Sequence, residues 1–138
     1  MATLVLYNAY LSVGGVDLSD HVQSLVLNTG QTIQDATKMG DSTVTNTAGL
    51  ATWSLDVTFL QDYAASKVDA TLEPLLGIGV SPTTIIVNPA GSTTATANPK
   101  YSGSAILESY NPIGGAVGDN AVASATFQSA GDLTRATS

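Results

Sequence analysis

The chain has 138 residues, of which 43% are hydrophobic, no cysteine and a net charge of −7 at pH 7. This length fits one domain with its own hydrophobic core, and the lack of cysteine excludes a disulfide framework and a thiolate metal site. Only four residues are Lys or Arg, which excludes a basic patch for gripping phosphates. Charged residues make up 11% of the chain, against roughly 25% in an average domain.

Serine and threonine supply much of the polar content instead of charge. A surface of hydroxyls and small residues can be buried against other copies of the chain with little charge to desolvate. An ordinary Thr-rich β-domain of the secreted type fits this composition equally well. No basic region precedes the short apolar stretch at residues 4–13, so we expect neither a signal peptide nor a membrane span.

Alternation of apolar and polar residues predicts the first strands. Residues 7–13 alternate and end at Gly14-Gly15, which predicts a strand followed by a turn. Residues 22–28 form a more continuous apolar run, so we expect a strand that is covered on both faces.

Residues 29–46 contain few large apolar side chains and are too long for a simple hairpin turn. They are predicted to form a long loop, and loops of this length in compact domains are usually functional or disordered. Residues 53–60 then show the clearest alternation in the chain. Trp53, Leu55, Val57 and Phe59 are predicted to face the core, whereas Thr52, Ser54, Asp56 and Thr58 are predicted to face water or a partner.

The second half of the chain predicts one helix and three more strands. Residues 64–76 carry apolar side chains at helical spacing, with Ser66 as a candidate N-cap and Gly77 as a candidate end. Pro74 predicts that the last turn is kinked or separate. Strands are predicted at residues 83–87, 101–110 and 121–129, and the Gly-, Ser- and Pro-rich segments between them are predicted loops.

No constellation of residues predicts catalysis. His21 is the only histidine, and a serine-protease arrangement would need Ser19 or Ser24 and Asp17 or Asp20 beside it. Neighbours on one turn do not reach that geometry easily, so a solvated turn histidine is the better interpretation. Asp17 and Asp20 lack the spacing of an EF-hand loop, and the glycine pairs match no nucleotide fingerprint.

Two strand carboxylates, Asp56 and Glu108, are candidates for a glycosidase pair. Nothing in the sequence pairs them, and aromatic side chains to line a sugar site are scarce. Exposed strand carboxylates are the better interpretation, and we expect no enzyme activity and no cofactor.

The chain resembles the major tail proteins, or tail tube proteins, of long-tailed phages with non-contractile tails. The matching stretches cover nearly the whole chain and are AYLSVGGVDLSDHV at residues 9–22, DATKMGDS at 35–42, Gly49-Leu50 before the tryptophan strand, and ATFQSAGDLTR at 125–135. The resemblance rests on the pattern and order of these stretches. Some relatives carry a further immunoglobulin-like domain, and we expect residues 1–138 to be a single tail tube domain without one.

The resemblance implies a mainly β fold, a tail-tube-type β-sandwich or barrel with one flanking helix. Six copies would pool their sheets into a ring with a continuous β-barrel lumen, and stacked rings would form the tube through which double-stranded DNA leaves the capsid without specific binding. It also implies partners at the tail tip, a tail terminator and a tape measure protein, and a place in the virion tail after assembly in the host cytoplasm, with no membrane partner.

Within this family the loop at residues 29–46 is expected to join subunits or rings. The residues assigned to that contact are Asp35, Thr37, Lys38, Met39, Gly40, Asp41 and Ser42. The candidates for the lumen wall are Asp56 and Glu108, because an acidic wall repels phosphates and lets DNA slide.

Two other classes of function stay open. A tube subunit of a contractile tail or of a type VI-like secretion system would share the same fold. A carbohydrate-binding β-sandwich would need exposed aromatic residues at a loop end, whereas the single tryptophan, Trp53, is predicted to face the core.

Overall fold

The computed structural model describes residues 7–91 and 93–137, and over this range the chain is mainly β with one short helix. The mainly β fold with a flanking helix is therefore confirmed. No helix in the described part of the chain is long and apolar enough to cross a membrane. In chain order the elements are β1 (Tyr10–Val13), β2 (Val16–Asp17), the 3₁₀ turn η1 (Ser19–His21), β3 (Val22–Asp35), β4 (Asn46–Leu60), α1 (Val68–Leu72), the 3₁₀ turn η2 (Glu73–Leu75), β5 (Thr83–Asn88), β6 (Lys100–Asn111), β7 (Val122–Ser129) and β8 (Thr134–Ala136).

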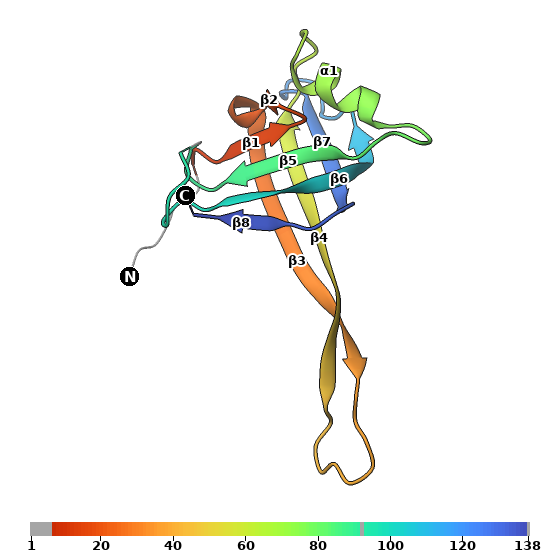
Figure 1. The fold of residues 1–138 in the computed structure, drawn as a ribbon. Coiled ribbons are helices and arrows are strands. Elements are labelled where there is room, and N and C mark those ends of the chain that lie inside the picture. Colours follow the sequence, from red (N-terminus) through yellow and green to blue (C-terminus); the bar gives the residue numbers. More distant parts are fainter. Residues whose placement is uncertain (1–6, 92, 138) are drawn as a thin grey trace.

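The strands form one antiparallel sheet in the order β2-β1-β5-β6-β7-β4-β3, with β8 paired to β6. The sheet is open, since β2 and β3 lie at its two ends. In Figure 1 the strands β1, β5, β6 and β8 run across β3, β4 and β7, so the sheet bends into two layers. Strand β6 belongs to both layers, because Ala105 pairs with Thr83 of β5 on one side and Ser129 of β7 on the other. A strand that bends from one layer into the next is a usual corner of steeply crossed layers.

The core lies between the two layers and is built on the alternation of β4. Trp53, Leu55, Val57 and Phe59 are buried as predicted, and the intervening side chains are exposed or half-buried. The other layer and the helix supply the opposing buried side chains, which are Leu11, Val13, Ile85, Val87, Val68 and Leu72. The two layers therefore share one hydrophobic core.

The helix is shorter than predicted. Helix α1 begins at Val68 after Lys67, and Ser66 adopts a φ of +62° and is not the cap. Pro74 lies in the separate 3₁₀ turn η2, which confirms the predicted break before the last turn. Val68 and Leu72 hold the helix on the core. The helix thus ends early because Pro74 cannot continue its hydrogen-bond pattern.

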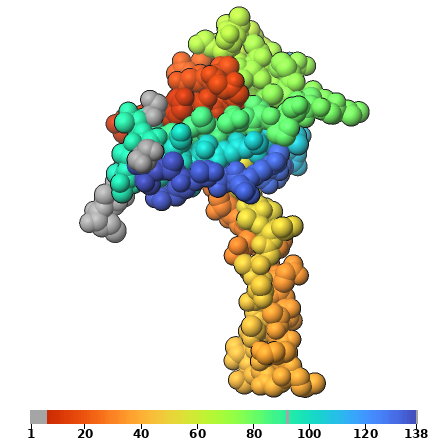
Figure 2. Space-filling view, in the orientation of Figure 1, coloured from red at the N-terminus to blue at the C-terminus, as the bar shows by residue number. Residues whose placement is uncertain are grey.

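The segment 29–46 was predicted as a long loop, and this prediction is wrong for residues 29–35 and 46, which lie in strands. Strand β3 continues to Asp35 and β4 begins at Asn46, so only residues 36–45 form a loop. The paired part beyond Gly30 projects from the body as an arm, orange to yellow in Figures 1 and 2. At about 3.4 Å per residue, the five residues of β3 and the six of β4 in this part carry the arm roughly 17–20 Å from the body before its tip.

The expected covering of both faces of residues 22–28 is also not found. Leu25 and Leu27 pack partly against the core, but Val26 points to the opposite face and is 52% exposed. The apolar run therefore combines one core-facing set with one exposed valine.

We predict that Gly103→Ala destabilises the fold. A Cβ on Gly103 would lie 2.8 Å from Cζ2 of Trp53 and 2.9 Å from the carbonyl oxygen of Asp132, and the indole is held because its N–H donates to the Gly131 carbonyl at 2.8 Å. Overpacking of this kind costs about 1–3 kcal/mol. Denaturant unfolding followed by Trp53 fluorescence measures the change.

Gly30→Ala is the matched control, because a Cβ there meets no atom within 4 Å. We expect its free energy of unfolding to stay within about 0.5 kcal/mol of the parent. Equal stability of the two variants would contradict the close packing at Gly103.

Candidate functional site

The layer made of β3, β4, β7 and the second half of β6 carries a continuous polar surface on the side away from the core. The pairing registers place its residues in rows across the strands. We call this surface the polar face; it consists of Ser24, Val26, Asn28, Ser54, Asp56, Thr58, Ser124, Thr126, Gln128, Ile106, Glu108, Ser109 and Asn111. Its side chains are mostly hydroxyls and carboxamides, which follows from strict alternation against a buried opposite face.

Asp56 and Glu108 both lie on the polar face and are its only charged residues. Asp56 pairs with Thr126 of β7, which in turn pairs with Ser109, the neighbour of Glu108. Two strand spacings of about 4.8 Å put the carboxylates roughly 10 Å apart. The structure thus brings together two residues that the sequence offered separately.

Each carboxylate is held by a carboxamide and not by the other carboxylate. The Asn28 amide donates to Asp56 at 3.4 Å, and the Gln128 amide donates to Glu108. Both side chains are exposed on the surface of a sheet. This arrangement fits a smooth acidic wall better than a pair of acid and base around a sugar.

The predicted assembly residues lie together at the tip of the arm, as their spacing in the sequence requires. Their polar groups hold one another: the Asp35 carboxylate accepts the Thr37 N–H at 2.9 Å, and Asp41 accepts the Lys38 N–H at 2.9 Å and its ammonium at 3.2 Å. The bonds from Lys38 lower the pKa of Asp41. Gly40 has a φ of +97°, which favours glycine, and turns the chain at the tip. The tip therefore has a defined shape although it has no core.

The arm carries large apolar side chains in open solvent. Ile33, Met39, Val44 and Leu50 are each more than half exposed. A two-stranded hairpin is marginally stable alone in water. Its exposed apolar residues therefore suit it to packing against another surface.

Strand β3 forms a free edge along the same layer. It pairs with β4 on one side and ends the sheet on the other, over Val22–Asp35. Neither lysine nor proline interrupts this strand, and those residues are the usual means of blocking edge pairing. The pairing of β3 with β4 shifts register between Val22 and Ser24 and between Gln31 and Ile33, so among the described residues the regular stretch from Ser24 to Gln31 is the part of the edge that could pair with a strand from another chain.

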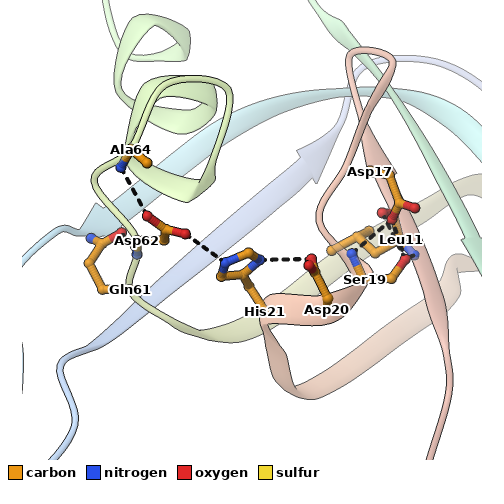
Figure 3. Close-up of polar contacts among 8 residues, drawn as sticks. All are labelled: Leu11, Asp17, Ser19, Asp20, His21, Gln61, Asp62 and Ala64. Atoms are coloured by element: carbon orange, nitrogen blue, oxygen red, sulfur yellow. Dashed lines mark hydrogen bonds and ion pairs between the residues drawn. The ribbon is translucent and has the colours of Figure 1, made fainter.

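His21 joins the turn after β2 to the segment after β4. Its Nδ1 lies 2.8 Å from Asp20 and its Nε2 lies 2.9 Å from Asp62, as Figure 3 shows. The Asp62 carboxylate also accepts the Ala64 N–H at 2.9 Å, and this bond and the one to His21 lower the pKa of Asp62. The prediction of a solvated turn histidine is wrong, because the His21 side chain is only 14% exposed.

His21 is not part of a catalytic triad. Ser19 instead donates to Asp17 and accepts the Leu11 N–H at 2.9 Å, away from the imidazole in Figure 3. Asp17 and Asp20 therefore serve two separate turns. No group of three or more His, Asp or Glu side chains in the described ranges could hold a metal ion.

No protein-family model matches the chain, and no curated protein matches its sequence. Solved structures do match its fold. A chain from the virion of a native gene transfer agent particle has a TM-score of 0.72 at 13% identity, over 93% of this chain and 95% of that one.

A chain from the tail of an empty gene transfer agent particle with C6 symmetry gives a TM-score of 0.64 at 15% identity, over 83% of this chain and 81% of that one. A chain from the six-fold symmetrised baseplate of the anti-feeding prophage gives 0.65 at 8% identity, over 98% and 97%. At these identities the likeness shows a shared fold.

We predict that His21→Ala loosens the contact between the two segments. Loss of two charge-assisted hydrogen bonds lowers Tm by roughly 2–6 °C in a domain of this size. Because the pKa of Asp62 is lowered in the folded state, the stability it contributes is present above its ordinary pKa and is lost as pH falls through the lowered value. Thermal unfolding at neutral and acidic pH measures both effects.

Asp20→Asn is the matched control, because the Asp20 side chain is 71% exposed. We expect it to change Tm by less than half as much as His21→Ala. The same loss in both variants would show that Asp62 adds nothing to the contact.

Proposed function

We propose that this chain is a non-enzymatic structural subunit of a phage-type tail tube. Six copies form a ring whose lumen is lined by the polar face, stacked rings form the tube, and double-stranded DNA passes through it during ejection. The observation that carries this proposal is the polar face itself, a surface mostly of hydroxyls and carboxamides with two carboxylates, two apolar side chains and no cation.

The charge of this face suits a passage for DNA. Every cation on a wall adds a phosphate contact that holds the polymer and releases counterions, whereas carboxylates repel it. Asp56 and Glu108 contribute two negative charges per copy, which makes twelve around a ring of six. Hydroxyls and carboxamides between them keep the wall hydrated.

The edges and the arm support self-assembly. In a ring, the free edge of β3 would meet the neighbouring subunit, and closure leaves no edge exposed in the lumen wall. The arm, with its exposed apolar residues and its defined tip, would contact an adjacent subunit or ring. The C6 symmetry belongs to a tail particle whose chain shares this fold, and it supports the count of six.

A tube subunit of a contractile tail or a type VI-like system is the second candidate. The structural likeness to the chain from the anti-feeding prophage baseplate supports this second candidate, because the likeness covers 98% of the present chain. In that case the partner at one end of the tube would be a baseplate.

The assembly is tested with the purified chain over a wide concentration range. We expect six-fold rings or tubes by electron microscopy and a concentration-dependent rise in sedimentation coefficient. A monomer at every concentration and ionic strength would refute the proposal.

The lumen assignment is tested with Asp56→Lys tubes assembled in the presence of short DNA duplexes. We expect these tubes to retain DNA that nuclease cannot reach, most at low salt, because the reversed charge attracts phosphates inside the wall. Glu73→Lys, on the exposed turn η2, makes the same charge change outside the polar face. Its tubes are expected to bind only nuclease-accessible DNA. Intact Asp56→Lys tubes with no protected DNA would remove Asp56 from the lumen.

A further inference from the structure

A hollow of about 620 Å³ lies in the angle between the root of the arm and the body. Ala51, Trp53 and Leu133 supply apolar walls, and Thr29, Asp132 and Arg135 supply polar ones. Figure 2 shows the C-terminal segment, dark blue, directly above the root of the arm. This volume lies in the range of about 300–1,000 Å³ that is usual for binding pockets.

Arg135 is an unusual residue at this place. It is exposed and forms no ion pair within residues 7–91 and 93–137. It is one of only four cations in a chain with a net charge of −7. The hollow therefore offers an apolar floor with one cation, Arg135, and one carboxylate, Asp132, on its rim, and Arg135 is the group that can attract an acidic side chain of a partner.

The loop at residues 112–121 lies at the opposite end of the same layer. The pairs Leu60 with Val122 and Asn111 with Ser124 place it where β4 ends and β7 begins. The Asp119 N–H donates to the Ala116 carbonyl at 3.0 Å, which closes a turn that presents Val117 fully to solvent. Asp119 is the only charged residue of the loop. The loop therefore presents an exposed apolar side chain, Val117, and two residues later a carboxylate, Asp119.

We infer that the loop 112–121 of one copy occupies the hollow at the arm root of the next copy in the stack, with Val117 against Trp53 and Asp119 beside Arg135. The inference rests on the proposed function and names its stacking contact. Trp53 and Leu60 lie about 24 Å apart along one strand, so a head-to-tail repeat along the strands brings one end of the layer to the other. Such a heterologous contact joins unlike surfaces and continues without limit, as a stack requires.

The charges of Asp119 and Arg135 and the position of the hollow beside the arm both favour a second copy of the chain as the occupant. Copies of net charge −7 repel one another, and a contact between Asp119 and Arg135 places opposite charges where the copies approach most closely. The arm bounds the hollow on one side. The end of a subunit that enters the hollow is therefore also within reach of the exposed apolar residues of the arm.

A charge exchange tests the pairing. We expect Asp119→Arg and Arg135→Asp each to raise the concentration needed for stacking at least tenfold, because like charges then face each other. The double variant is expected to return within about threefold of the parent. Rings are expected to persist in all three. Asp119→Arg changes the net charge from −7 to −5 (−7 + 2), which weakens general repulsion, so its loss of stacking would be specific.

Glu73→Arg is the matched control, since it makes the same charge change on an exposed turn away from both surfaces. It is expected to stack like the parent. Val117→Asp tests the apolar part of the contact. It is expected to raise the concentration needed for stacking, because a carboxylate would replace the valine against Trp53.

The outcomes separate the two proposals. A parent chain that forms neither rings nor tubes refutes the proposed function. Parent tubes with single charge variants that stack normally, a double variant that is not rescued, or a Val117→Asp variant that stacks like the parent overturn this contact and leave the function standing. Single variants that lose rings as well as stacks also overturn it, because the contact would then lie within the ring.

Discussion

Strict alternation along the second half of β4, from Trp53 to Leu60, is the constraint on which the rest of the structure depends. The strand is paired on both sides, with β3 and with β7, so its register cannot move without moving both neighbours. A shift by one residue would turn Trp53, Leu55, Val57 and Phe59 out of the core and bury Asp56 in their place. The same pattern that builds the core therefore decides which side chains are left for the opposite surface.

Much of the fold could be predicted from this periodicity. Every strand longer than three residues overlaps a predicted strand or the predicted loop next to one, and the break at Pro74 follows from proline chemistry. The arm could not be found in the same way. Neither of its faces meets a core, so its residues have no reason to alternate, and a polar strand pair looks like a loop. At residues 22–28 the sequence predicted more burial than the structure shows. Val26 continues the apolar run, but its side chain faces away from the core.

The candidate site was less accessible to sequence reasoning because it is assembled through pairing between distant strands. Asp56 and Glu108 could each be named as strand carboxylates, but their common surface depends on β7, which lies between them. The contacts of His21 were hard to predict from the sequence for the same reason. Asp20 adjoins His21 in the sequence, whereas Asp62 follows 41 residues later and carries no local signal. The carboxamides of Asn28 and Gln128 were missed for the same reason.

In the proposed ring, the edge of β3 has a consequence for how assembly would begin. An open row of n subunits has one contact fewer than it has members, whereas a closed ring has as many contacts as members. The last contact is made without the loss of translational freedom that each earlier one requires. Partial rows are therefore the least stable species, and growth would show a lag and a sharp threshold. If the proposed ring forms, its subunits would stay dispersed below that threshold, because an open row lacks the closing contact.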